Sequence, residues 1–354
     1  MFLHMPRLHL TLLALSAMLL GALAANCTLQ SGAVPAASSG TVSPAAMSRP
    51  FYVGADISSI AGGGGRGGPT TYQDVMGTTG SELSIMMAHG WNAFRLRVFL
   101  SPVRGAPNNS LENTIPLAKQ IKAAGAMFML DIHYSDTWAD PQHQNIPAAW
   151  QGQTVEEVEV SVEAYTRDLL TQLKAAGAAP DMVQVGNEIT GGTLWPLGHV
   201  KVPPSDVKND AGRIQALPEL YDDAKQWSNF TRFIKAGTRG VRATLPDAKI
   251  IIHIDCGGDW PITKWYFDHF TESGVDYDII GQSFYPNYHG TLTLMQQNIA
   301  ETYNRYHKPV IIAETGYPQT GNPQSGRNGR YMFWPGTPEG LAAVRRLCGL
   351  PASE

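Results

Sequence analysis

The 354-residue sequence carries little net charge. Its 26 Lys and Arg residues nearly balance its 30 Asp and Glu residues, which gives a formal charge of -4. A chain without a basic excess has little with which to neutralise a phosphate backbone, so we expect no nucleic-acid partner. Because 43% of the residues are apolar, an intrinsically disordered chain is excluded as well.

Cysteine is also scarce, and several common site motifs are missing. The three cysteines form no Cys-x-x-Cys pair, and the sequence contains no His-Glu-x-x-His segment, so a zinc site has no support. A Gly-x-Ser-x-Gly elbow is missing too, which argues against a serine hydrolase. We expect no metal and no other cofactor. Cys256 and Cys348 either pair with each other or remain buried thiols, because the sequence gives no distance between them.

Long apolar runs are confined to the first 25 residues. The run from Leu10 to Ala24 is about 15 residues long, shorter than the roughly 20 that a spanning helix needs. It ends in Ala22-Leu23-Ala24, the small-x-small pattern of a signal-peptidase site. We therefore predict a signal peptide over residues 1–25, a secreted protein and no membrane association after cleavage. The alternatives are an uncleaved anchor or lipidation at Cys27.

Beyond the signal peptide, residues 26–50 are mostly Ala, Ser, Gly, Thr and Pro and predict a flexible lead-in segment. From residue 51 the chain alternates short β-branched runs with longer amphipathic stretches, which predicts parallel strands joined by helices. Seven such units over about 300 residues fit a (β/α)8 barrel better than an open sheet. The predicted strands are Phe51–Ile57, Ala93–Phe99, Met127–His133, Met182–Gly186, Lys249–Ile254, Tyr277–Ser283 and Val310–Glu314. The predicted helices are Leu111–Ala124, Val155–Ala176, Asn229–Ala243, Ile262–Ser273 and Leu292–Tyr306.

Two glutamates follow apolar strands directly, at the strand ends where barrel enzymes place their active sites. Glu188 follows the fourth strand and Glu314 ends the seventh, so both should project into the barrel mouth. Two carboxyl groups that face one glycosidic bond are the minimum machinery for its hydrolysis, one as a protonated acid and one as an ionised nucleophile. We expect Arg97 to keep Glu314 ionised. A surface ion pair is the alternative for either glutamate alone.

Other strand ends and loops carry side chains suited to a sugar. Hydroxyl groups need acidic, amide or imidazole partners, and the apolar faces of sugar rings stack on aromatic planes. Besides the glutamates, the predicted substrate-binding residues are Asp56, Arg97, His133, Asp136, Trp138, Asn187, His253 and Tyr285, with further aromatic candidates at Trp150, Trp195, Tyr288 and Trp334. His133 and His253 could instead support other residues, and any single tryptophan could belong to the core.

At these motifs the sequence resembles glycoside hydrolase family 53, the secreted arabinogalactan endo-β-1,4-galactanases. The resemblance runs from about Phe51 to Leu347 and rests on several segments. These include Arg95-Leu96-Arg97-Val98, Asp131-Ile132-His133-Tyr134-Ser135-Asp136-Thr137-Trp138-Ala139-Asp140-Pro141, Gln184-Val185-Gly186-Asn187-Glu188-Ile189 and Glu314-Thr315-Gly316-Tyr317-Pro318.

The resemblance implies a TIM barrel in which Glu188 is the acid/base and Glu314 the nucleophile, with retention of anomeric configuration. It implies β-1,4-galactan, the side chain of type I (pectic) arabinogalactan, as the polysaccharide substrate, and we expect a monomer. After Trp334 the sequence offers one helix and no eighth strand, so we expect residues 51–354 to form a barrel that is incomplete at its C-terminus. The alternatives are another barrel β-glycanase or a non-catalytic sugar-binding remnant.

Overall fold

The structure is a computed structural model that describes residues 51–60, 71–102, 109–204, 221–318 and 331–332. The predicted signal peptide, the lead-in segment, Cys27, Trp334, Cys348 and the predicted last helix lie outside the described residues. The residues from Tyr52 onward belong to one compact unit, and the description below concerns this unit alone.

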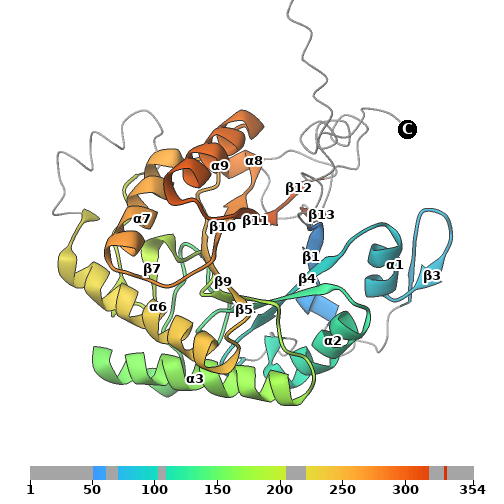
Figure 1. The fold of residues 1–354 in the computed structure, drawn as a ribbon, viewed down its shortest axis with the longest axis horizontal. Helices are drawn as coiled ribbons and strands as arrows, with labels where there is room; N and C mark the ends of the chain where they lie inside the picture. Colours follow the sequence, from blue (N-terminus) through green and yellow to red (C-terminus); the bar gives the residue numbers. More distant parts are fainter. Residues whose placement is uncertain (1–50, 61–70, 103–108, 205–220, 319–330, 333–354) are drawn as a thin grey trace, which may run out of the picture. The chain divides into compact units, whose positions relative to one another are not determined.

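A seven-stranded, fully parallel sheet forms the centre of this unit. The strands follow one another in chain order across the sheet, and all seven predicted strands are confirmed. Figure 1 shows that the sheet curls, and over the described residues this is the geometry of a (β/α)8 barrel without its closing part. The strands are β1 (Gly54–Asp56), β4 (Ala93–Val98), β5 (Met127–Ile132), β6 (Met182–Val185), β9 (Lys249–Ile254), β10 (Ile279–Phe284) and β11 (Val310–Thr315).

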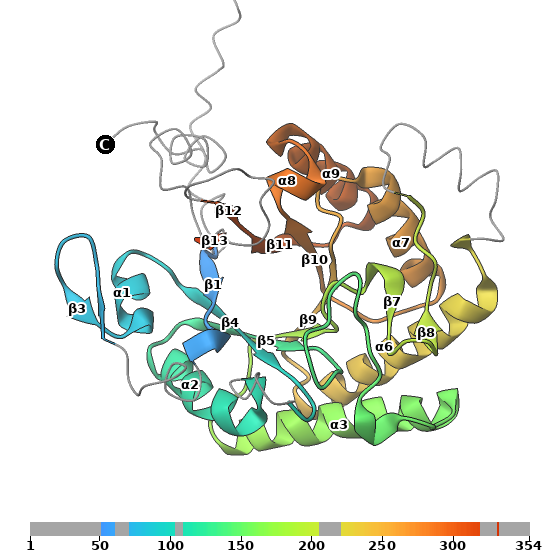
Figure 2. The same ribbon diagram turned by 180° about the vertical axis from the view of Figure 1, so that it is seen from behind.

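Helices lie along the outside of the curled sheet, and the reverse view in Figure 2 shows the same arrangement. Each crossover between parallel strands needs such a segment. Thr154 begins the third helix with a full capping box, because its side chain accepts from Glu157 N–H while the Glu157 carboxylate accepts from Thr154 N–H. The helices are α1 (Glu82–Ala88), α2 (Leu111–Ala123), α3 (Val155–Ala175), α6 (Ala224–Thr244), α7 (Trp260–Glu272), α8 (Pro286–His289) and α9 (Leu292–Tyr306).

The described residues also form short elements outside the central sheet. They include three 3₁₀ turns at η2 (Ser58–Ile60), η4 (Ala148–Trp150) and η5 (Ile189–Gly191). Three two-stranded antiparallel pairs are formed by β2 (Tyr72–Gln73) with β3 (Thr79–Gly80), β7 (Gly192–Thr193) with β8 (Gly198–His199), and β12 (Tyr317–Pro318) with β13 (Tyr331–Met332). Helices α1 and α8 and all three pairs were not among the predicted elements.

Successive side chains along the strands point to opposite faces of the sheet, so the buried apolar residues form two separate clusters. Residues such as Val183, Ile250 and Ile252 face the helices and belong to the large apolar core. A second, smaller cluster of Met129, Met182, Ile251 and Ile279 packs on the concave side of the sheet. Since side chains two residues apart share a face, the residues that follow these four toward the strand ends also face the concave side. That side therefore has an apolar floor, and the residues above it form the site.

Among the described residues, no helix has both the length and the apolar character needed to cross a membrane.

Candidate active site

Glu188 lies just beyond β6 in an uncommon backbone conformation. Its φ and ψ of 47° and 51° fall in the left-handed region, which costs a non-glycine residue about 1–2 kcal/mol. Gly186, two residues earlier, has a φ of 86°, and a Cβ there would lie 2.7 Å from Ile189 Cγ2. The Gly186-Asn187-Glu188 segment thus turns sharply off the strand, and the Glu188 side chain is only 8% exposed.

Glu314 reaches the same side of the sheet through an irregularity in β11. Gln282 pairs with Ile312 but Ser283 pairs with Glu314, so Ala313 is an extra residue in that strand. Ile311 and Ala313 already pack against the concave cluster, and strict alternation would point Glu314 toward the helices. The bulge reverses that alternation, a known way in which strands re-aim a side chain beside an active site. Glu314 lies within β11, at the end of the predicted strand Val310–Glu314, whereas Glu188 lies beyond the end of β6.

Arg95 on β4 joins the two strand ends. Its Nη1 donates to Glu314 Oε1 at 2.6 Å and lies 3.5 Å from Asp56 Oδ2. Its Nη2 donates to Asp131 Oδ2 at 2.6 Å and to Asn187 Oδ1 at 2.7 Å. The guanidinium is almost fully buried, so these partners supply the compensation that a buried charge requires.

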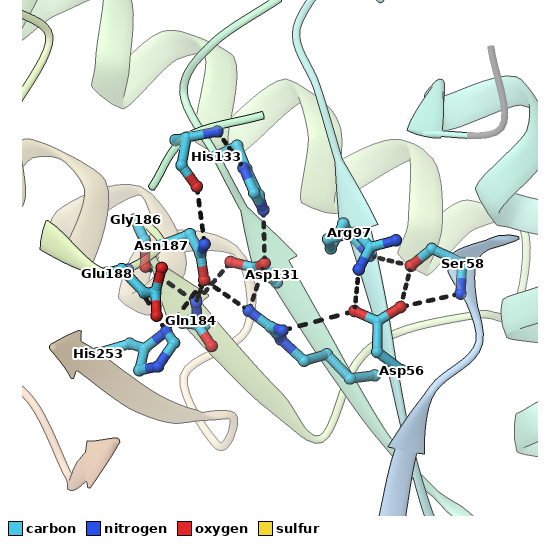
Figure 3. A network of polar contacts seen from close by, with 12 residues as sticks. Asp56, Ser58, Arg97, Asp131, His133, Gln184, Gly186, Asn187, Glu188 and His253 are labelled. Atoms are coloured by element: carbon cyan, nitrogen blue, oxygen red, sulfur yellow. Dashed lines mark hydrogen bonds and ion pairs between the residues drawn. The ribbon is translucent and has the colours of Figure 1, made fainter. Parts of the chain in front are cut away.

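Asn187, next to Glu188, is held by residues of three strands and by the loop after β5. Its Oδ1 accepts from Arg95 Nη2 and, at 3.1 Å, from Gln184 Nε2, and it lies 3.0 Å from His253 Nδ1. Its Nδ2 donates to Ala139 O at 2.8 Å. Figure 3 shows the resulting network, which runs from Glu188 and His253 through Asn187 and Asp131 to Asp56 and Arg97. An amide nitrogen has two N–H bonds, so Asn187 keeps the capacity to donate to a sugar hydroxyl as well.

The two glutamates have opposite shifts in acidity. Burial raises the pKa of Glu188, and the negative charge of Glu314 raises it further. Burial also opposes ionisation of Glu314, but the positive charge of Arg95 and its short hydrogen bond hold the pKa of Glu314 below its ordinary value. At neutral pH this favours a protonated Glu188 opposite an ionised Glu314. Two carboxyl groups in these states are what acid-assisted nucleophilic attack on a glycosidic bond needs.

Arg97 does not hold Glu314, contrary to the expectation from the sequence. Its Nη1 lies 3.1 Å from Asp56 Oδ2, and its guanidinium stacks 4.0 Å from the centre of the Trp138 ring. The two arginines share a face of β4. Arg95 lies two residues before Arg97, at the position that pairs with Asp56 of β1, and from there its guanidinium reaches the carboxyl groups. The pair of Arg97 and Trp138, whose ring is 48% exposed, instead offers a flat surface beside the mouth.

The two histidines lie behind the carboxyl groups and are fully buried. His133 Nδ1 accepts from Ala139 N–H at 2.9 Å, so its Nε2 carries the proton and donates to Asp131 Oδ2 at 2.8 Å. Burial lowers the pKa of His253 to about 4, so this ring is neutral between Asn187 and Ser283. Their burial fits the alternative in which they support other residues instead of contacting a sugar.

Of two further predicted binding residues, Tyr285 contacts a catalytic glutamate and Asp136 does not. Tyr285 Oη donates to Glu314 Oε2 at 2.9 Å, which places it in the site. Asp136 accepts from Ser101 N–H and Ala148 N–H with its two oxygens, so it ties two loops together and lies outside the group around the glutamates.

The remaining aromatic candidates differ in how far they are exposed to solvent. Trp150 is buried against Tyr165 in the core, as the alternative reading of a lone tryptophan allows. Trp195 is half-buried and packs against His199 with the two rings tilted by 52°, and Tyr288 is 67% exposed.

Several supporting residues received no role from the sequence. Arg95, Asp131 and Gln184 stand in segments that carry the family resemblance but received no role of their own, and neither did Ser283 or Gln144. Alternation on β4 and β5 could have grouped Arg95 with Asp131, because both share the concave face with Arg97. Gln144 comes from a loop, where no periodicity indicates which way a side chain points.

A parallel barrel sheet whose mouth holds one protonated and one ionised carboxyl group defines a glycosidase. Comparison with known proteins narrows that class. A model of glycosyl hydrolase family 53 matches residues 52–334. The chain is 39% identical over 300 residues to an uncharacterized protein of the bgaB 5' region of Niallia circulans, covering 84% of this chain and 76% of that protein.

Named relatives agree with this match. Over 286 residues the chain is 34% identical to a probable arabinogalactan endo-β-1,4-galactanase A of Aspergillus terreus, covering 78% of this chain and 73% of the relative. A solved fungal β-1,4-galactanase superposes with a TM-score of 0.66 at 30% identity, covering 84% and 83% of the two chains. The catalytic domain of the Ignisphaera aggregans family 53 enzyme gives 0.68 at 29% identity, covering 84% and 80%. The protein belongs to glycosyl hydrolase family 53.

Proposed function

We propose that this protein is a secreted, endo-acting, retaining glycosidase that cleaves β-1,4-galactan in type I arabinogalactan. The observation that carries the proposal is the pair of Glu188 and Glu314, whose pKa values are shifted in opposite directions, upward for Glu188 and downward for Glu314. The substrate follows from the names of the relatives, which are arabinogalactan endo-β-1,4-galactanases.

In the first step, the ionised Glu314 attacks the anomeric carbon while Glu188 gives its proton to the leaving glycosidic oxygen. Tyr285 and Arg95 each donate to one oxygen of Glu314 and so orient the attacking carboxylate. As the bond to the sugar forms, the negative charge of Glu314 disappears and the proton on Glu188 departs. In the second step Glu188 takes a proton from water, which attacks the same carbon and releases Glu314, so two inversions restore the configuration.

The test is a substrate panel combined with product stereochemistry. We expect reducing-sugar release from β-1,4-galactan and little from mannan or cellulose, and we expect the β-anomer to appear first in proton NMR. Glu188→Gln and Glu314→Gln should each abolish this activity. Preferential cleavage of another glycan would make the protein a different β-glycanase, and binding of galactan without cleavage would make it a sugar-binding remnant.

Secretion and a monomeric state are separate parts of the proposal. Mass spectrometry of the protein in the culture medium of its source should find a mature N-terminus after residue 24 or 25. An uncleaved or lipidated N-terminus in the membrane fraction would contradict secretion. Light scattering of the purified protein should give the mass of one chain.

A further inference from the structure

Gln144 lies behind Glu188, and neither the sequence nor the family resemblance gave it a role. It comes from the loop after β5, and its side chain is almost completely buried. Its Nε2 lies 2.8 Å from Asn187 O, 3.1 Å from Asp140 O and 3.4 Å from Glu188 O. All three partners are carbonyl oxygens, so the side-chain amide must present its nitrogen to them.

The main-chain atoms of the same loop segment extend this contact. Gln144 O accepts from Trp195 N–H at 2.7 Å, and Asn145 forms a bridge with Trp195. One loop residue therefore contacts the chain on both sides of η5, at Asn187 and Glu188 before it and at Trp195 after it. Side chains on loops are generally held less precisely than side chains on strands or helices, so a buried loop residue with several hydrogen bonds is a notable support.

The backbone of Glu188 needs such a support. A left-handed conformation at a non-glycine residue persists only where the surroundings enforce it. The acid must also hold its proton in line with the glycosidic oxygen, and a small displacement of a catalytic group is costly. The carbonyl groups that Gln144 holds fix the peptide planes on either side of the Glu188 Cα atom.

We propose that Gln144 is a positioning residue that fixes the backbone of Glu188 so that its carboxyl group can protonate the leaving oxygen. This inference rests on the proposed function, in which Glu188 is the acid. Gln144 itself contacts neither the carboxyl group of Glu188 nor Glu314 among its hydrogen-bond partners in the described residues. Because the two carbonyl groups that it holds flank the Glu188 Cα atom, its effect should fall mainly on acid catalysis.

The experiment compares two substrates that differ in their need for an acid. The sugar that leaves from β-1,4-galactan needs a proton, whereas 2,4-dinitrophenolate leaves from 2,4-dinitrophenyl β-galactobioside without one. Gln144→Met keeps the length of the side chain and removes both N–H donors. We expect kcat/KM on galactan to fall by about 10- to 100-fold, part of the 10²- to 10⁴-fold that general acids contribute. On the dinitrophenyl substrate we expect a change of less than about threefold, since no acid is needed there.

Gln142→Met is the matched control, because Gln142 is exposed on the same loop and, among the described residues, hydrogen-bonds through its backbone N–H alone, to Asp140 Oδ1. It should change neither rate. If Gln144→Met does not fold, Gln144→Asn retains the amide on a shorter side chain and should show the same selective loss. Equal losses on both substrates would mean a merely structural role and would overturn the inference, as would an unchanged rate on galactan.

Glu188→Ala, measured alongside, separates the inference from the proposed function. A selective loss on galactan in Glu188→Ala but not in Gln144→Met overturns only the role of Gln144. Equal losses on both substrates in Glu188→Ala would remove the acid assignment itself, and with it the basis of the inference.

Discussion

The two glutamates belong to two differently built strand ends. Glu188 follows β6 on a strained turn held by backbone contacts, whereas Glu314 lies within β11 at a bulge and receives hydrogen bonds from Arg95 and Tyr285. Burial acts against ionisation in both places, but only Glu314 has a cation in direct contact with its carboxylate among the described residues. The difference teaches that the surroundings and not the residue type set the direction of each pKa shift, because Arg95 lowers the pKa of Glu314 while burial and the charge of Glu314 raise that of Glu188.

Removing the nucleophile should have the largest effect. Glu314→Gln keeps the shape but cannot attack the anomeric carbon, so kcat on galactan should fall by at least about 10⁴-fold, as when a nucleophile is removed from other covalent mechanisms. Reducing-sugar assays would measure this, with circular dichroism as the check on folding. Retention of more than about one hundredth of the activity would show that the nucleophile lies elsewhere.

Removing the guanidinium of Arg95 should remove the electrostatic difference between the two strand ends. Arg95→Met leaves the buried Asp131 and the partly buried Glu314 without this cation, which should cost about 3–5 kcal/mol of unfolding free energy. The pKa of Glu314 should rise, so the acid limb of the kcat/KM profile should move to higher pH. Urea unfolding and a pH–rate profile are the measurements.

The control for the cation is Arg97→Met, the same substitution on the same strand. Arg97 pairs with Asp56 and stacks on the partly exposed Trp138, so its loss should be less destabilising and should leave the acid limb in place. A shift of that limb in Arg97→Met but not in Arg95→Met would reinstate the expectation drawn from the sequence.

A smaller effect is expected where only one hydrogen bond to Glu314 is lost. Tyr285→Phe removes the donor to Oε2, and hydrogen bonds to charged groups are worth about 1.5–3 kcal/mol. We expect kcat to fall by about 10- to 100-fold, since 1.4 kcal/mol corresponds to a factor of about ten. Tyr303→Phe, on the exposed side of α9, should have no effect on steady-state rates. A full-rate Tyr285→Phe enzyme would show that Arg95 alone orients the nucleophile.

The smallest expected effect concerns stability, and it has opposite signs at the two sites. The folded pKa of Glu188 is raised, so the wild type loses stability as pH rises from the ordinary glutamate value through the folded one. Glu188→Gln avoids this loss and should be more stable than the wild type at neutral pH, by about 1–2 kcal/mol, with little difference near pH 4.

The folded pKa of Glu314 is lowered, so its ionised form adds stability above the ordinary value, and that stability is lost as pH falls through the folded pKa. Glu314→Gln should therefore be less stable than the wild type at neutral pH. Thermal melts at several pH values would measure both variants, with Glu301→Gln at an exposed position of α9 as the surface control. The same sign at both sites would contradict the comparison of the two strand ends.

Much of the fold followed from local patterns. Each predicted strand exists, and most boundaries agree within about two residues, because alternation and β-branched runs act locally. The first strand begins at Gly54 instead of Phe51, since Val53 N–H is bonded to the Asn92 side chain. Helix α6 begins five residues before its prediction, with Asp223 as its N-cap. Helix α1 is short, at seven residues, and its pattern was too brief to detect.

The sequence by itself determined the order of strands and helices and the kinds of side chain at the strand ends, because both depend on neighbours along the chain. Only the tertiary structure decided which arginine meets Glu314, which face Glu314 occupies and what supports Glu188. Arg95 and Glu314 are 219 residues apart, and the bulge at Ala313 changes a side chain's face without any mark in the local pattern. Protonation states depend on burial and on charges brought together by folding, and neither exists before the sheet has formed.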